Sequence, residues 1–202
     1  METYKSRFIE FLLECGALKF GEFRLKSGRS SPFFINLGEI DSGRRFEAIG
    51  EFLAQALVSG FPQATSLFGP AYKGIPLATA AAMGLWKAGQ KEVGVFYDRK
   101  EAKEHGEGGT FIGRLPTRQD AIVIIDDVMT DGATKLEAIK AIEQRFQVTP
   151  AGVLVTVDRT FKGAQPPFTL GSIVTLPEIV SFLRGSGDTR ADLINNYWEQ
   201  GS

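Results

Sequence analysis

Residues 122–134 constrain the fold of this chain more than any other segment. They read Ile-Val-Ile-Ile-Asp-Asp-Val-Met-Thr-Asp-Gly-Ala-Thr: an apolar run, two adjacent carboxylates and a small-residue loop, followed by a helix predicted from about Ala133 to Phe146. Four consecutive aliphatic residues are typical of a strand covered on both faces in a parallel sheet. Ligands of such sheets bind beyond the carboxyl ends of the strands, where Asp126 and Asp127 fall. The segment therefore predicts an α/β fold with a binding site at this edge.

The loop and the two carboxylates suit different parts of a ligand. Thr130 and Thr134 supply hydroxyls, Gly132 is free to adopt a positive φ, and the free N–H groups at a helix start bind anions. Carboxylates repel a phosphate, so Asp126 and Asp127 suit a sugar diol or the water shell of a metal ion. A ribose 5-phosphate satisfies both halves. The spacing is not that of a Walker A loop, and the alternative is a buried strand with an ordinary Asp-Gly turn.

This segment resembles the signature of the type I phosphoribosyltransferases, in which an aliphatic strand, Asp-Asp and a Thr-x-Gly-x-Thr loop bind 5-phosphoribosyl 1-diphosphate (PRPP). The resemblance implies an α/β fold with a central, mostly parallel sheet flanked by helices and a small N-terminal hood. Asp131 departs from the family, which usually has Ala there, and adds a negative charge beside the phosphate. The PRPP-binding residues implied here are Asp126, Asp127, Val128, Met129, Thr130, Asp131, Gly132, Ala133 and Thr134.

Helical and strand patterns alternate along the chain, as they do in parallel sheets. No linker, repeat or low-complexity segment divides the 202 residues, so a single domain is expected over 1–202. Its core is expected at about 41–160, with a hood formed by about 1–40 and parts of the C-terminal segment. The predicted strands are 65–68, 92–97, 121–126 and 152–157, with short antiparallel pieces between 18 and 35. The predicted helices are 3–15, 43–59, 73–88, 132–146, 177–184 and 188–198.

Composition narrows the class of protein. A net charge of −1 argues against a general nucleic-acid binder. The longest mainly apolar run, near 77–86, is shorter than the roughly 18 residues of a membrane helix, and the first residues lack the features of a signal peptide. The single cysteine, Cys15, cannot form an intramolecular disulfide, which favours a reducing compartment. We therefore expect a cytoplasmic protein with no nucleic-acid or membrane partner.

A second candidate anion loop lies at residues 67–76, where a strand end, glycines and the cation Lys73 again precede a helix. If the strands are parallel, this loop reaches the same sheet edge as the first, and two such loops suit a ligand with two phosphate groups. A turn with a solvated lysine is the alternative. In the type I family the equivalent loop holds the pyrophosphate, and its first peptide is often cis. The resemblance thus implies that Tyr72 and Lys73 bind PRPP.

Residues 99–109, Arg-Lys-Glu-Ala-Lys-Glu-His-Gly-Glu-Gly-Gly, have little apolar surface to bury and suit a mobile lid. A solvated loop with no further role is the alternative. The segment is similar to the catalytic loop of orotate phosphoribosyltransferases, Arg-Lys-x-x-Lys-x-His-Gly-x-Gly-Gly. In that family the lid belongs to the neighbouring subunit, which implies a homodimer with shared active sites. The catalytic residues implied, all of which would also contact PRPP, are Lys73, Arg99, Lys100, Lys103 and His105.

Residues 25–34, Leu-Lys-Ser-Gly-Arg-Ser-Ser-Pro-Phe-Phe, indicate the base. They are similar to the Leu-Lys-Ser-Gly-Arg-x-Ser-Pro-x-Phe segment of the orotate enzymes, in which Lys26 would contact substrate and PRPP and the backbone of the last residues pairs with the pyrimidine. Ile35 replaces a common Phe. Arg159, after the last strong predicted strand, matches the family's carboxylate-binding arginine, although a lone strand-end Arg is more often a structural ion-pair partner. The orotate-binding residues implied are Lys26, Phe34, Ile35, Thr130 and Arg159.

Together the matches, from about 18 to 159, imply a member of the orotate phosphoribosyltransferases. These enzymes make orotidine 5′-monophosphate and pyrophosphate from orotate and PRPP in pyrimidine biosynthesis. Mg²⁺ is the implied cofactor, held mainly by PRPP and pyrophosphate oxygens, with Asp126 and Asp127 reached through water. Two alternatives remain: a non-catalytic PRPP-sensing regulator of the same fold, and a phosphoribosyltransferase for another base. The segment after Gly163 matches too weakly to interpret.

Overall fold

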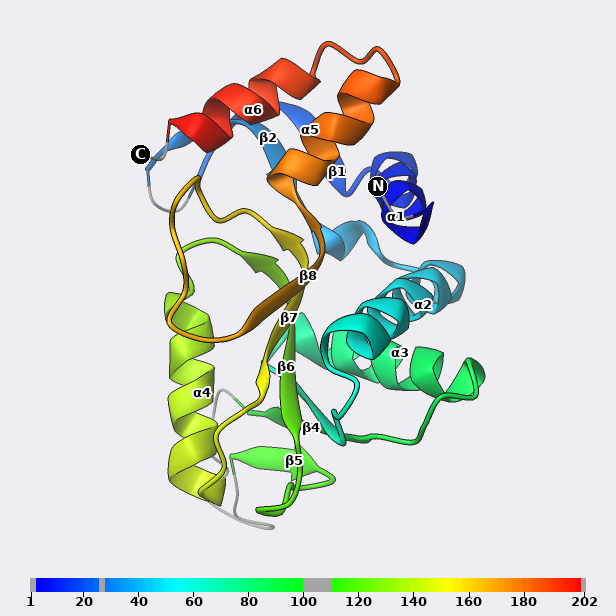
Figure 1. The fold of residues 1–202 in the computed structure, drawn as a ribbon, viewed down its shortest axis with the longest axis vertical. Coiled ribbons are helices and arrows are strands. Elements are labelled where there is room, and N and C mark those ends of the chain that lie inside the picture. The colour runs from blue at the N-terminus through cyan, green and yellow to red at the C-terminus, as the bar shows by residue number, and fades with distance from the viewer. Residues whose placement is uncertain (1–2, 26–27, 100–109, 201–202) are drawn as a thin grey trace.

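The computed structural model describes residues 3–25, 28–99 and 110–200. Its strands form a six-stranded sheet in the order β5-β4-β3-β6-β7-β8 and a separate antiparallel pair, β1-β2 (Figure 1). Only the edge pair β4-β5 of the large sheet is antiparallel, so the predicted mostly parallel sheet is confirmed. The strands are β1 (Leu18–Arg24), β2 (Ser30–Ile35), β3 (Ser66–Gly69), β4 (Gly94–Asp98), β5 (Phe111–Gly113), β6 (Ile122–Met129), β7 (Gly152–Asp158) and β8 (Leu170–Thr175).

The α-helices lie where the sequence predicts them, with ends that differ by three residues or fewer, whereas the short 3₁₀ helix η1 was not predicted. The largest difference is at the last helix, which starts at Ala191 rather than 188 because the Asp188 carboxylate accepts from the Arg190 N–H and forms a turn first. The helices are α1 (Thr3–Glu14), the short 3₁₀ helix η1 (Leu37–Glu39), α2 (Gly43–Gly60), α3 (Gly74–Lys87), α4 (Ala133–Phe146), α5 (Leu176–Gly185) and α6 (Ala191–Glu199).

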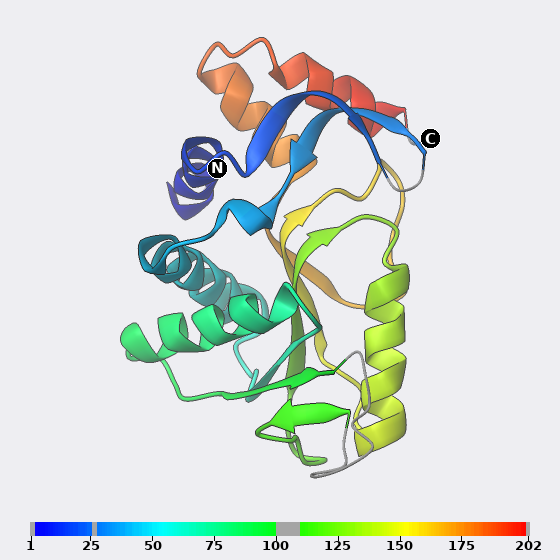
Figure 2. The same ribbon diagram turned by 180° about the vertical axis from the view of Figure 1, so that it is seen from behind.

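Strand β6 runs through the middle of the sheet, and its residues alternate between two apolar cores. Val123 and Ile125 pack into the larger core with α2 and α3, whereas Ile122 and Ile124 pack into the smaller core with Ile142 of α4. Figures 1 and 2 show α2 and α3 on one face of the sheet and α4 on the other. This alternation directs Asp126 toward α4 and Asp127 toward α3.

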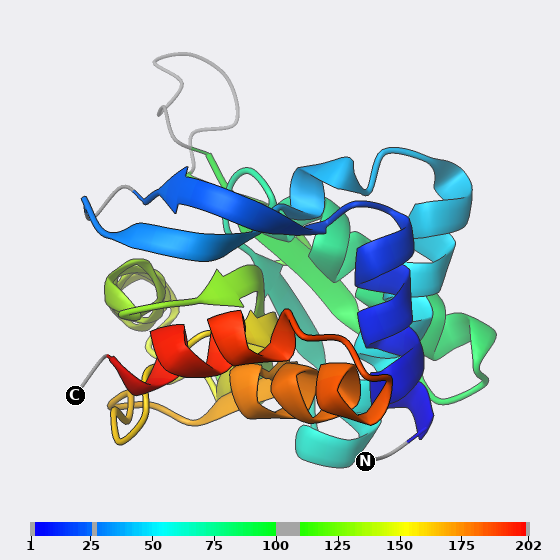
Figure 3. The same cartoon turned by 90° about the horizontal axis from the view of Figure 1, so that it is seen from above.

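The N-terminal and C-terminal segments lie together over one end of the sheet (Figure 3). Helix α6 packs against β2, where the Tyr197 ring meets Phe33 edge-on with 5.3 Å between ring centroids. The segment after Gly163, which the sequence left uninterpreted, thus covers the same end of the molecule as the β1-β2 hairpin. The boundary between hood and core near residue 40 stays a prediction. No helix in the described ranges is both long and apolar enough to cross a membrane.

Candidate functional site at the carboxyl edge of the parallel strands

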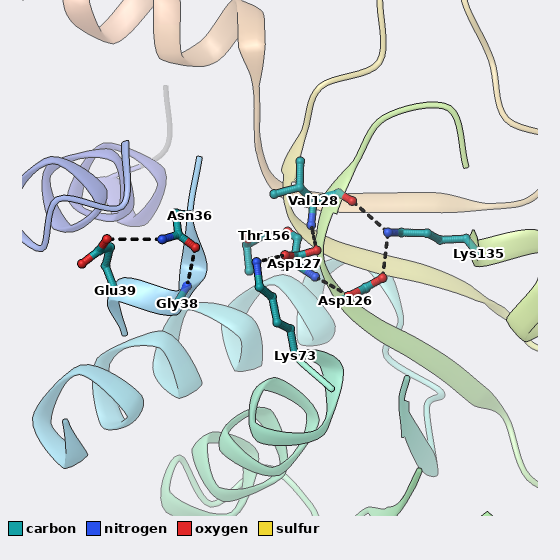
Figure 4. Close-up of polar contacts among 9 residues, drawn as sticks. All are labelled: Asn36, Gly38, Glu39, Lys73, Asp126, Asp127, Val128, Lys135 and Thr156. Carbon is teal, nitrogen blue, oxygen red and sulfur yellow. Dashed lines mark hydrogen bonds and ion pairs between the residues drawn. The ribbon is translucent and has the colours of Figure 1, made fainter. Parts of the chain in front are cut away.

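The two adjacent carboxylates of β6 point to opposite faces of the sheet, and each is paired with a lysine (Figure 4). Asp126 Oδ2 lies 2.7 Å from Lys135 Nζ of α4, and Asp127 Oδ2 lies 3.0 Å from Lys73 Nζ. The strand was predicted to end at Asp126, which is wrong: β6 continues to Met129 by pairing with β7 up to Asp158. Asp126 and Asp127 therefore lie within the last residues of the strand, not beyond its end.

Main-chain hydrogen bonds fix both carboxylates. Asp126 Oδ1 accepts from the N–H of Asp127 at 2.8 Å, and Asp127 Oδ1 accepts from the N–H of Val128 at the same distance. Burial raises the pKa of the Asp126 carboxyl, the Lys135 ammonium opposes that effect, and the Asp127 carboxylate adds to it. Asp126 and Asp127 thus present fixed oxygen acceptors at this edge of the sheet.

The loop from β6 to α4 has the form expected of an anion site. Gly132 adopts φ +80°, a backbone conformation that L side chains rarely adopt, and this favours glycine at the position. Thr130, Asp131, Ala133 and Thr134 are exposed, whereas the Met129 side chain is buried in the smaller core. The Asp131 carboxylate accepts from the Ala133 N–H at 3.1 Å. Asp131, the residue that departs from the family pattern, therefore already accepts a hydrogen bond from one of the N–H groups at the start of α4.

The loop from β3 to α3 packs tightly against β6. A Cβ on Gly69 would lie 2.4 Å from the Gly74 oxygen, and one on Gly74 would lie 2.8 Å from the Ile125 oxygen. Asp98, at the end of β4, accepts from the Ala71 N–H at 2.7 Å and fixes the loop from the other side. The cis peptide in this loop joins Ala71 to Tyr72.

The loop from β3 to α3 and the first turns of α4 line one cavity of about 340 Å³. The predicted parallel arrangement has brought them to the same sheet edge, with the β6 carboxylates between them. Larger grooves lie on the outer side of α2 and α3, away from these residues. The residues lining the cavity are Pro70, Ala71, Tyr72, Lys73, Ile124, Asp126, Asp127, Thr134, Lys135 and Ala138.

Arg159 follows β7 and is buried between the core and the hairpin. Its guanidinium carbon lies 4.6 Å from the Phe33 ring centroid and 5.7 Å from that of Tyr197. Burial lowers the pKa of the guanidinium, and Tyr197 opposes this effect. Among the described residues, Arg159 makes no ion pair, and its buried Nε has no hydrogen-bond partner. Within the described residues it is therefore not the structural ion-pair partner that such an arginine usually is.

Several predicted site residues lie elsewhere or cannot be placed. Phe34 and Ile35 lie in β2, where the Phe34 ring stacks on Phe23 and Ile35 is buried. Arg99 follows β4, and its N–H donates to the Thr110 oxygen at 2.7 Å, so the ends of the predicted lid meet. Lys26, Lys100, Lys103 and His105 lie outside the described residues.

Lys135 is a site residue that sequence reasoning missed. It lies on the inward stripe of α4, which continues through Ala138, Ile139, Ile142 and Phe146 of the smaller core. A lysine at the start of an otherwise apolar helical stripe was the available signal.

Residues 36–165 match the family model of the phosphoribosyl transferase domain. The matched region includes both anion loops, all of β6 and Arg159. The mostly parallel sheet and the two loops at one edge agree with this match. The fold and the site thus define the class of protein, the type I phosphoribosyltransferases.

Individual relatives narrow the class. Two orotate phosphoribosyltransferases, from Methylococcus capsulatus and Proteus mirabilis, are 43% and 41% identical to this chain. The alignments cover 94% and 96% of this chain and 93% and 94% of the relatives. The crystal structure of orotate phosphoribosyltransferase from Francisella tularensis superposes with a TM-score of 0.78 at 30% identity, covering 95% of this chain and 96% of that one. The chain belongs to the orotate phosphoribosyltransferase family.

Proposed function

We propose that this protein transfers the 5-phosphoribosyl group of PRPP to N1 of orotate, giving orotidine 5′-monophosphate and pyrophosphate in pyrimidine biosynthesis. One observation carries the proposal: the loop from β3 to α3 and the start of α4 line a single cavity with two fixed carboxylates between them. A ligand with phosphate at both ends and a diol in the middle matches that order of groups. The names of the relatives support the choice of orotate as the base.

The three parts of PRPP are assigned to three parts of the cavity. The loop residues 128–134 and the start of α4 would bind the 5′-phosphate. Asp126 and Asp127 would accept hydrogen bonds from the ribose hydroxyls. Tyr72 and Lys73 would bind the pyrophosphate. The Lys73 side chain is about half exposed, and its pair with Asp127 is therefore weak enough for Lys73 to turn toward a more highly charged ligand.

Orotate is assigned to the region where Arg159 meets β2. Orotate carries a carboxylate, and a buried guanidinium that makes no ion pair with any described residue is a suitable partner for it. Phe33 of β2 stacks on Arg159, which brings the backbone of the neighbouring Phe34 and Ile35 close to the same point. Thr130 and Lys26 complete the proposed orotate contacts.

The oxygen donors at the cavity fit Mg²⁺ that is held mainly by its substrate. Among the residues described, no group of three or more His, Cys, Asp or Glu side chains could hold a metal ion. Mg²⁺ commonly binds one or two carboxylates, several waters and substrate phosphates, and Asp126 and Asp127 supply that number of carboxylates. When bound, the ion would supply positive charge next to the pyrophosphate oxygens.

The reaction then depends chiefly on charge. Cleavage of the bond between C1 of the ribose and its oxygen builds negative charge on pyrophosphate and positive charge on the ribose ring. The negative charge on pyrophosphate would be stabilised by Lys73 and Arg99, with Lys100, Lys103 and His105 of the lid. Asp126 and Asp127 would stabilise the positive charge on the ribose ring. Orotate is already nucleophilic at N1 as its anion, so no residue is assigned as a general base.

A homodimer with shared sites is part of the proposal. Helix α3 leaves Met83 and Trp86 67% and 70% exposed, and they line an apolar groove whose rim carries Glu47, Glu51 and Lys87. An apolar centre with a charged rim is typical of a protein interface. The same groove extends to Pro76 and Thr79 in the first turns of α3, so a second copy packed along it would reach toward the pyrophosphate loop. A cytoplasmic location stays a prediction.

The function is tested by following the absorbance of orotate with purified protein, PRPP and Mg²⁺. Orotate should be consumed only when PRPP is present, with pyrophosphate formed in equal amount. Uracil, adenine, guanine and hypoxanthine serve as alternative bases in the same assay. Turnover of one of these bases without turnover of orotate would replace the proposed substrate, and PRPP binding with no turnover of any base would indicate a regulator.

A further inference from the structure

Lys135 is a buried lysine that none of the steps above requires. It is 7% exposed, although its helix neighbour Lys140 lies on the exposed face of α4. Burying an ammonium group is unfavourable unless hydrogen bonds and an opposite charge compensate. Helix α4 thus places the charge of Lys135 at the start of a buried stripe that is otherwise apolar.

The Lys135 ammonium joins α4 to both sides of the β6 carboxylate pair. It lies 2.7 Å from Asp126 Oδ2, and it donates to the Val128 carbonyl oxygen at 2.9 Å. Asp126 Oδ1 is already held by the Asp127 N–H. Two of the three N–H donors of Lys135 therefore fix the Asp126 carboxylate and the end of β6 relative to the first turn of α4.

Stability alone does not explain this arrangement. A buried ion pair is often no more stabilising than apolar side chains of similar volume, and apolar partners already surround α4 on this face. What an apolar pair would lose is a carboxylate oxygen fixed at the cavity wall, where both Asp126 and Lys135 lie. The pair therefore serves the cavity more than the core.

We infer that Lys135 is a positioning residue that sets Asp126, and with it the ribose site, at a fixed distance from the phosphate loop at the start of α4. The inference rests on the proposed PRPP site. Lys135 and the phosphate loop belong to the same helix start, so one contact fixes the two subsites that a ribose 5-phosphate must occupy together. Among the described residues, Lys135 makes no hydrogen bond or ion pair with the pyrophosphate loop between β3 and α3.

The test is calorimetric binding without metal, with ribose 5-phosphate and pyrophosphate as separate probes. Lys135→Met removes the charge at similar length, and Lys140→Met is the matched control on the exposed face of the same helix. We expect Lys135→Met to weaken ribose 5-phosphate binding about tenfold or more, as is common when a supporting partner of a binding group is removed. Pyrophosphate binding should change less than twofold, and Lys140→Met should bind both probes like the wild type. Equal loss of both probes, or no loss, would overturn the inference.

A double variant separates positioning from a general structural role. If Lys135 acts through Asp126, Lys135→Met in an Asp126→Asn background should weaken ribose 5-phosphate binding no further than Asp126→Asn alone. Additive losses would contradict this. The double variant leaves no unpaired buried carboxylate, so the comparison remains available if Lys135→Met alone does not fold. These measurements do not depend on turnover, so an inactive wild type would refute the proposed reaction without deciding the role of Lys135.

Discussion

At the scale of single residues, Asp131 makes the clearest prediction about PRPP binding. Its carboxylate occupies the Ala133 N–H at the start of α4, where the 5′-phosphate is proposed to bind. A phosphate must displace this carboxylate or bind beside its charge. Asp131→Ala should therefore lower the KM for PRPP about fivefold, which corresponds to about 1 kcal/mol for one charge at a helix start. Steady-state kinetics at low salt would measure it.

Asp131→Asn is the control for that experiment, because it removes the charge and keeps a side-chain oxygen that can accept from Ala133. If charge is the cause, both variants lower KM. If the hydrogen bond is the cause, only Asp131→Ala does. A higher KM in Asp131→Ala would show that the carboxylate supports the PRPP site instead of competing with it.

Arg159 makes the corresponding prediction about the base. Arg159→Met keeps most of the packing against Phe33 and removes the charge proposed to bind the orotate carboxylate. We expect kcat/KM for orotate to fall about 100-fold, or about 3 kcal/mol, as when one partner of a buried charge pair is removed. PRPP affinity should stay within twofold. Lys162→Met, which removes a cation from the Trp198 ring at the same end of the molecule, is the control; an equal loss in both variants would argue against a specific carboxylate contact.

At the scale of secondary-structure elements, the connection before β6 depends on Asp120. Its carboxylate accepts from the Thr117 N–H and hydroxyl, from the Thr65 hydroxyl and from Arg114, and the Thr117 N–H contributes most to lowering the Asp120 pKa to about 2. Because the folded-state pKa lies below the ordinary value of 3.8, the stabilisation is complete above about pH 4 and is lost as the pH falls through about 2.

Asp120→Asn should therefore lower the free energy of unfolding by about 2 kcal/mol at pH 7. The difference from the wild type should shrink as the pH falls from 4 to 2. Urea denaturation at several pH values measures both effects. Asp192→Asn, which removes a carboxylate from an exposed pair with Arg184, is the control and should differ little from the wild type at any pH.

The elements that the sequence predicted well are those with strong local patterns. The helices have amphipathic or apolar stripes, and β3, β4, β6 and β7 each contain a run of two to four apolar residues. The strands β5 and β8 were missed because they are edge strands: β5 has only three residues, and β8 begins Leu-Gly-Ser with little apolar pattern. Both take their strand form mainly from pairing with a neighbour.

The features of the site likewise divide into those that local motifs predicted and those that depend on packing between elements. Local motifs predicted both anion loops, but the continuation of β6 past Asp126 and the contacts of Lys135 depend on packing against β7 and α4. No motif encodes such contacts, because the partners are far apart or on different elements. Arg159 was found only through the family resemblance, since its significance lies in its burial without an ion pair.

At the scale of the whole molecule, the exposed face of α3 predicts how two copies associate. Trp86→Glu would place a charge in the centre of the apolar groove proposed to bind the second copy. We expect the variant to sediment as a monomer at micromolar concentration and, if sites are shared, to lose most of its activity. The control is Arg118→Glu, an exposed charge change outside that groove. A dimeric Trp86→Glu protein would place the interface elsewhere.

Shared sites make a stricter prediction, because each would combine the lid of one subunit with the carboxylates of the other. Lys103→Ala disables the lid, and Asp127→Asn disables the carboxylate pair, so each variant alone should be nearly inactive. Mixing equal amounts with subunit exchange makes about half of the dimers hybrid, and each hybrid has one intact site of two. About a quarter of wild-type activity should therefore return. If native mass spectrometry shows hybrids but activity stays absent, each lid acts on its own subunit, and the apolar face of α3 has a role other than completing the site.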